Sequence, residues 1–153
     1  MEKSKVSFSE KIHFIGIGGI GMSGLAEVMK DMGFNVQGSD IANNKNIERC
    51  RKNGIKIFLK HNKRNIINSS IIVKSSAIGN NNPEIIFAKS KKLKILKRAE
   101  MLAHVVSLKK KYRNNRFTRK NHYNISYFKN FIRCQIRSNN NNRRCNKFYK
   151  TFS

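Results

Sequence analysis

The residues best suited to chemistry are a group of glycines near the N-terminus. Gly16, Gly18 and Gly21 have the spacing G-x-G-x-x-G, and Gly19 adds a fourth glycine to the same turn. Glycines let the backbone approach an anion closely, and the amides and dipole of a helix N-terminus then favour a phosphate. The spacing alone is a weak signal, because a glycine turn can also serve only to pack a helix against a strand. We interpret the turn as a phosphate site and look for residues that would select the ligand.

Other polar residues follow predicted strands, where the ligands of a parallel sheet bind. Asp40 follows a strand 19 residues after Gly21, where a dehydrogenase has an acid for ribose hydroxyls, although an exposed turn aspartate would look the same. His61 ends another strand and is either a ligand contact or a loop histidine. Ser75 and Ser76 could donate hydrogen bonds to phosphate or sugar, or could simply form a turn.

Residues 1–110 contain no recognisable nucleophile–base pair, acid–base carboxylate pair or metal-ligand cluster, so we predict no catalytic residue and no metal site. The three cysteines, Cys50, Cys134 and Cys145, lack C-x-x-C spacing, and this odd number fits a reducing cytoplasm. The N-terminal arm, residues 1–10, is polar and unlike a signal peptide, and no apolar run approaches the ~20 residues of a membrane span. We therefore expect a soluble cytoplasmic protein without membrane contact.

The elements that would position these residues alternate between strand and helix. Asn44 and the pair Asn82-Pro83 are expected to begin two of the helices. The alternation predicts an α/β fold over 11–108, a Rossmann-like doubly wound parallel sheet whose carboxyl edge gathers the candidate residues into one site. Strands are predicted over 12–15, 34–38, 55–59, 71–73 and 93–96, and helices over 20–32, 44–53, 82–92 and 98–107.

The net charge of +25 is unevenly distributed along the chain. Residues 111–153 contain 12 of the 33 basic residues, no acid and nine of the 14 aromatic residues. Such a segment cannot bury enough apolar surface to offset its ordering entropy, so we expect 109–153 to be a disordered basic tail. Its cations and aromatic rings would bind nucleic acid through phosphates and stacking. This binding is either incidental or the function of a nucleic-acid-binding protein.

Taken together, five motifs resemble the N-terminal domain of the Mur ligase family. The resemblance is to the members that join L-alanine to UDP-N-acetylmuramic acid with ATP in peptidoglycan synthesis, and it covers about residues 10–110. The motifs are GIGGIGMSGLA at 16–26, GSD at 38–40, SSAI at 75–78, NPEI at 82–85 and RAEML at 98–102.

The resemblance implies that the domain holds the UDP part of UDP-N-acetylmuramic acid rather than a dinucleotide. The glycine-turn amides would bind the diphosphate, and Asp40 with the serine turn would lie along the uridine and sugar-phosphate path. His61 follows a lysine where the family commonly has glycine, so its role stays open. An NAD-binding dehydrogenase domain remains the alternative from the glycine spacing and Asp40. The implied substrate-binding residues are Gly18, Gly19, Ile20, Gly21, Met22, Ser23, Asp40, His61, Ser75 and Ser76.

In the family, an ATP-binding domain follows whose P-loop holds ATP phosphates and Mg²⁺, and then a domain that receives L-alanine. At the expected place this chain reads KKKYRNNRFTRKNHYNISYF. Codons permitted for residues 116–124, read one base later, encode Gly-Ser-His-Gly-Lys-Thr-Thr-Thr, a P-loop sequence. We therefore expect a frameshift near 109–112, in the gene or its sequencing. The 153-residue chain would then lack the ATP- and alanine-binding domains, hold no cofactor and be inactive by itself.

Overall fold

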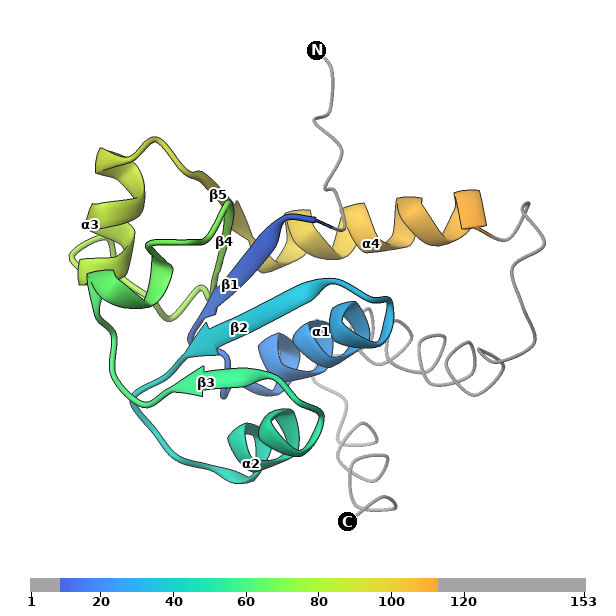
Figure 1. Cartoon of the computed structure of the whole chain (residues 1–153), viewed down its shortest axis with the longest axis horizontal. Coiled ribbons are helices and arrows are strands. Elements are labelled where there is room, and N and C mark those ends of the chain that lie inside the picture. The colour runs from blue at the N-terminus through green and yellow to red at the C-terminus, as the bar shows by residue number, and fades with distance from the viewer. Residues whose placement is uncertain (1–8, 113–153) are drawn as a thin grey trace. The chain divides into compact units, whose positions relative to one another are not determined.

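A single parallel sheet organises the chain in the computed structural model, which describes residues 9–112. Its five strands lie in the order β3-β2-β1-β4-β5 (Figure 1). This arrangement confirms the predicted α/β class and the doubly wound parallel sheet. The strands are β1 (Lys11–Ile15), β2 (Asn35–Ser39), β3 (Lys56–Phe58), β4 (Ile71–Lys74) and β5 (Lys94–Lys97). The helices are α1 (Ile20–Asp31), α2 (Lys45–Lys52), the 3-10 helix η1 (Lys63–Ile66), α3 (Pro83–Ser90) and α4 (Arg98–Tyr112).

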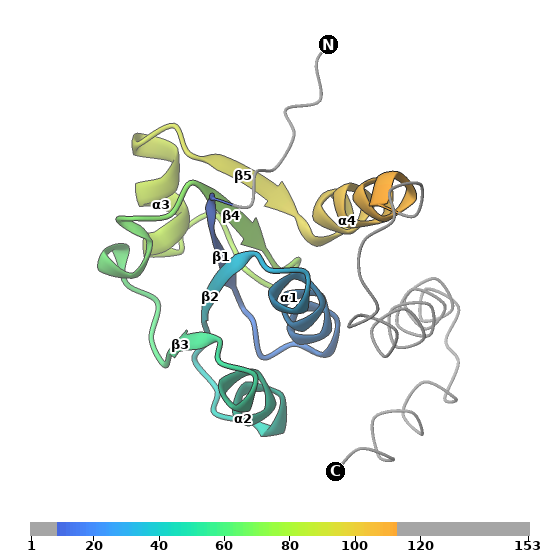
Figure 2. The same ribbon diagram turned by 45° about the vertical axis from the view of Figure 1, so that its right-hand side comes forward.

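The helices cover both faces of the sheet. Helices α1, α2 and α4 lie on one face, and α3 with η1 lies on the other, as Figure 2 shows. The chain runs outward from β1 to β3 and then returns to place β4 on the other side of β1. The strand order therefore reverses between β1 and β4, which is where ligands bind in open parallel sheets.

Two apolar layers hold the sheet between the helices. Ile15 and Ile72 pack against Ile66 of η1 and Ile85 of α3 in one fully buried cluster. Because successive strand side chains alternate between faces, Phe14 and Ile12 of β1 face the opposite layer under α1. The strands that flank the reversal point are thus covered on both faces and give the site a rigid base.

The predicted helix starts are present, but the last helix ends later than predicted. The Asn44 and Asn82 side chains accept hydrogen bonds from the amides of Ile47 (3.1 Å) and Glu84 (2.9 Å), which confirms both N-caps. Helix α4 continues to Tyr112, past the expected end at 107 and through residues 109–112, which we had assigned to the tail. No glycine or proline interrupts the segment, and leucine and lysine favour helix there. Residues 113–153, including the segment 116–124 whose neighbouring frame would encode the P-loop, lie outside the described residues.

Gly38 on β2 occupies a position without room for a side chain. A Cβ there would lie 2.6 Å from Ile17 Cδ1 and 2.9 Å from the Phe14 carbonyl oxygen of the neighbouring strand. We expect Gly38→Ala to lower the free energy of unfolding by about 2 kcal/mol, because overpacking would force the two strands apart. Urea denaturation measures this loss. The control is Gly19→Ala, whose Cβ would lie 3.6 Å from its nearest neighbour, and an equal loss in both variants would contradict the packing argument.

Candidate ligand-binding site

An open cavity lies at the carboxyl edge of the sheet, beside the point where the strand order reverses. Its volume of about 520 Å³ is within the range of small-molecule sites. The start of α1 forms one wall, and the ends of β4 and β5 form the others. The lining residues are Gly19, Gly21, Met22, Lys74, Ser75, Ser76, Lys97, Arg98 and Ala99. The structure thus brings five of the predicted site residues together.

The cavity has the chemistry of an anion site. Helix α1 begins at Ile20, and within residues 9–112 the amides of Ile20 and Gly21 donate to no acceptor. These amides and the helix dipole favour negative charge. Lys74, Lys97 and Arg98 line the same cavity and add positive charge. None of these three cations was among the predicted site residues, although each follows a predicted strand at the carboxyl edge.

Gly18 lies deeper, and both its N–H group and its carbonyl oxygen already have hydrogen-bond partners. Its amide donates to Asp40 Oδ2 at 2.7 Å, and its carbonyl accepts from the side-chain amides of Asn44 (3.2 Å) and Asn46 (2.8 Å). Asp40 Oδ1 also accepts from the Ala42 amide at 3.1 Å. Asp40 therefore lies at the glycine turn, as the sequence predicted. The Gly18 amide that we had assigned to a diphosphate points at this carboxylate.

Three predicted residues lie in different surroundings at the start of α1. Ile20 has a 54% exposed side chain, whereas Met22 is buried beneath the cavity. Ser23 is fully buried, where its Oγ donates to the Ile20 carbonyl (3.1 Å) and accepts from Arg49 (3.4 Å). The Ser23 amide donates to the Gly19 carbonyl (2.9 Å). Ser23 therefore joins α1 to α2 and does not line the cavity.

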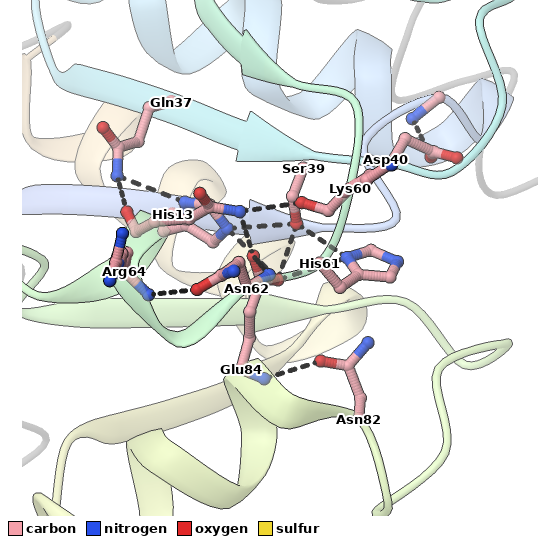
Figure 3. Close-up of polar contacts among 12 residues, drawn as sticks. His13, Gln37, Ser39, Asp40, Lys60, His61, Asn62, Arg64, Asn82 and Glu84 are labelled. Atoms are coloured by element: carbon pink, nitrogen blue, oxygen red, sulfur yellow. Dashed lines mark hydrogen bonds and ion pairs between the residues drawn. The ribbon is translucent and has the colours of Figure 1, made fainter.

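His61 belongs to a polar cluster under α3, centred on the buried carboxylate of Glu84 (Figure 3). Glu84 Oε2 accepts from Ser39 Oγ at 2.6 Å and lies 3.3 Å from His61 Nδ1 and 3.5 Å from His13 Nε2. Glu84 Oε1 accepts from the Asn65 side chain (2.7 Å) and the Asn62 amide (3.2 Å). We name these six residues and Gln37 the Glu84 cluster. The structure therefore places His61 beside Ser39 at the end of β2, among residues that do not line the cavity.

The surroundings of Glu84 favour its ionised form. Burial raises the pKa of this carboxyl, but the hydrogen bonds that His13, Ser39 and Asn65 donate to it outweigh that effect. The pKa of Glu84 is consequently lowered from its ordinary value of 4.5. Glu84 is a carboxylate at neutral pH and can only accept hydrogen bonds.

Sequence reasoning did not find the Glu84 cluster. Glu84 entered the sequence prediction only within the NPEI motif at a helix start, and His13 only as part of the predicted strand over 12–15. A signal was present, because His13 and Gln37 are register partners on adjacent buried strands and Ser39 follows at the next position on the same face. Polar residues at these alternating positions need partners from the covering helix.

Glu84 should make the stability of the chain depend on acid pH. Because its pKa is lower in the folded chain than the ordinary value of 4.5, its ionisation stabilises the fold above that pH. This stabilisation is lost as the pH falls through the folded-state pKa. We expect Glu84→Gln to lose less unfolding free energy than the original chain between pH ~6 and ~3. Urea titrations over this range test the expectation, and parallel curves would contradict it.

A second buried carboxylate joins α1 to α2. Glu27 Oε1 accepts from Arg49 Nε at 2.6 Å and lies 3.7 Å from Cys50 Sγ. Burial, together with the Glu27 charge, raises the pKa of the Cys50 thiol to about 12. Cys50 is therefore an inert packing residue at neutral pH.

The described residues contain neither a metal-ligand group nor a membrane-spanning helix. Among residues 9–112, no group of three or more histidine, cysteine or acidic side chains is placed to hold a metal ion. No helix in that part of the chain is both long and apolar enough to cross a membrane.

Comparison with known proteins gives consistent matches to one family. A family model described as "Mur ligase family, catalytic domain" matches residues 11–110. The UDP-N-acetylmuramate–L-alanine ligase of Pelagibacter ubique is 63% identical over 108 residues, which are 71% of this chain and 23% of that protein. The Rickettsia felis ligase of the same name is 56% identical over 100 residues, 65% of this chain and 21% of that protein. The chain thus spans less than a quarter of the length of these relatives.

A solved structure also resembles the described fold. The crystal structure of the UDP-N-acetylmuramate-alanine ligase of Thermotoga maritima aligns with a TM-score of 0.61 at 36% identity. The alignment covers 64% of this chain and 23% of that one. A murein peptide ligase from Psychrobacter arcticus, at 21% identity and a TM-score of 0.59, shows the same fold.

Proposed function

The chain belongs to the Mur ligase family, and from this premise we propose that residues 11–108 bind UDP-N-acetylmuramic acid. The ligase would join L-alanine to this substrate with ATP in peptidoglycan synthesis. The observation that carries the proposal is the cavity in which free helix amides meet Lys74, Lys97 and Arg98. Such a site suits the diphosphate, which carries most of the negative charge of the substrate.

Each group around the cavity has a distinct part in this proposal. The amides of Ile20 and Gly21 would donate to the diphosphate oxygens, and Ser75 and Ser76 would add hydroxyl donors from the end of β4. Lys97 and Arg98 would complete the cradle from the junction of β5 and α4. Asp40, an acceptor at the end of β2, suits ribose hydroxyls rather than phosphate.

The described residues would therefore hold the substrate, and the chemistry would need other parts of a ligase. ATP, with Mg²⁺, would phosphorylate the muramoyl carboxylate before the amine of L-alanine attacks it. The 153 residues contain no P-loop sequence in their reading frame. Resequencing the DNA for residues 105–125 tests the frameshift, because an intact P-loop in the neighbouring frame would remove the nucleic-acid interpretation of the tail.

Ligand-induced stabilisation tests substrate binding by the purified 153-residue chain. We expect UDP-N-acetylmuramic acid at 100 times its Kd to add about 2.7 kcal/mol to the unfolding free energy. Thermal unfolding would show this as a rise in Tm. NAD should have no effect, and stabilisation by NAD alone would support the dehydrogenase alternative. UDP-N-acetylmuramic acid with ATP and L-alanine should give no phosphate release, and turnover would contradict the predicted inactivity.

A further inference from the structure

The hydrogen-bond geometry of the Glu84 cluster bears on ligand binding as well as on the stability of the fold. We propose that Glu84 is a positioning residue for substrate binding, acting through Ser39 to fix the tautomer of His61. His61 then offers Nε2 as a hydrogen-bond acceptor to the nucleoside part of the UDP substrate. This inference rests on the proposed function and adds an orientation for the ligand.

The Ser39 hydroxyl has a single hydrogen, which it can donate to only one of its three neighbours. Glu84 is ionised and only accepts, so the 2.6 Å contact between Ser39 Oγ and Glu84 Oε2 needs the serine hydrogen. Ser39 Oγ must then accept from its other two neighbours. These are His61 Nδ1 at 2.9 Å and His13 Nε2 at 3.2 Å. His61 therefore carries its hydrogen on Nδ1.

The other hydrogen bonds of the Glu84 cluster agree with this assignment. The side-chain nitrogen of Gln37 donates to the Asn65 carbonyl at 2.7 Å, which fixes the orientation of the Gln37 amide. The same nitrogen lies 3.2 Å from His13 Nδ1, so this ring atom accepts and His13 Nε2 carries the hydrogen. Both imidazoles thus direct one N–H toward Ser39 and Glu84, and within the described residues no buried side-chain polar atom lacks a partner.

The opposite edge of the His61 ring carries Nε2. With Nδ1–H engaged, Nε2 has an unshared electron pair, and Figure 3 shows the second ring nitrogen pointing away from the Glu84 cluster. The His61 side chain is 8% exposed. An acceptor at this position matches a ribose hydroxyl or the imide N–H of uracil, and it does not match a phosphate oxygen. Together with Asp40 it would place the nucleoside toward β2 and β3, away from the cationic cavity.

A double-mutant cycle on the 153-residue chain tests the inference. Kd values for UDP and for inorganic pyrophosphate would be measured by calorimetry for His61→Ala, Glu84→Gln and the double variant. We expect each single substitution to weaken UDP binding about tenfold, the worth of one hydrogen bond. Pyrophosphate binding should stay within about twofold, since no nucleoside contact is involved. The double variant should bind UDP no more weakly than His61→Ala.

Controls separate positioning from a general loss of structure. Glu48→Gln, the same substitution at an exposed position on α2, should leave both Kd values unchanged. If Glu84→Gln still weakened UDP binding in the His61→Ala background, or weakened pyrophosphate binding equally, its role would be structural and the inference wrong. Unchanged UDP binding in the single variants would also overturn it. Absence of UDP binding by the original chain would instead overturn the proposed function.

A measurement on the unaltered chain keeps the inference testable if Glu84→Gln fails to fold. Nitrogen-15 NMR of the histidine rings reports which nitrogen carries the hydrogen. We expect a protonated Nδ1 and an unprotonated Nε2 for His61 at neutral pH. The opposite tautomer would overturn the inference.

Discussion

Replacing Lys97 and Arg98 together by glutamate should weaken UDP binding by more than about 100-fold, because each charged hydrogen bond to phosphate contributes ~1.5–3 kcal/mol. Both residues line the cavity where β5 leads into α4, opposite the free amides of α1. The two carboxylates would also repel the diphosphate directly. Calorimetric titration of the 153-residue chain with UDP measures the loss.

The matched control reverses the charge of another lysine–arginine pair. Lys63 and Arg64 are exposed on η1 and do not line the cavity. Lys63→Glu with Arg64→Glu changes the net charge by the same amount, so it should alter UDP affinity by less than about threefold through long-range effects. Equal losses in the two double variants would show that only overall charge matters and would remove the assignment of the cavity.

The largest loss of stability is expected for Glu84→Ala. This truncation leaves the hydroxyl of Ser39, the side-chain amide of Asn65 and the backbone amide of Asn62 without their buried acceptor. We expect the free energy of unfolding to fall by about 3–5 kcal/mol, the usual result of removing one partner from a buried charged network. Small domains have only ~5–15 kcal/mol in total, so this loss would remove a large fraction of the stability.

Two comparisons isolate the cause of that loss. Glu84→Gln keeps the volume and one acceptor oxygen, so it should lose less than half as much. Glu48→Ala removes an exposed acid of α2 and should change stability by less than about 0.5 kcal/mol. A small loss for Glu84→Ala in urea denaturation would show that water replaces the carboxylate and that the cluster is less tightly packed.

The fold was predictable because its signals are local. The strand, glycine turn and helix from Lys11 to Asp31 and the caps at Asn44 and Asn82 each depend on neighbouring residues, and the structure contains all of them. Element boundaries shifted by one or two residues, with α4 the larger exception. There, the helix was predicted to end at Ser107, but the Oγ of this residue donates to the His104 carbonyl within the helix at 2.7 Å.

The site was only partly predictable, because its members meet through the fold. The cavity joins Gly21, Ser75 and Arg98, which are far apart in sequence and come together only when β1, β4 and β5 are adjacent. A parallel sheet implied that edge but not which cations would lie at it. Glu84 was hidden for a different reason, since an acid in the first turn of a helix already has a local explanation.

Asp40 accepts a hydrogen bond from the Gly18 amide, so its carboxylate competes with the substrate for that amide. A diphosphate that uses the Gly18 amide must displace a carboxylate already 2.7 Å away, so it exchanges one charged acceptor for another. A ribose that draws Asp40 toward its hydroxyls would release the amide at the same moment. Nucleoside and diphosphate would then bind cooperatively, with the whole ligand gaining more affinity than its two fragments measured separately.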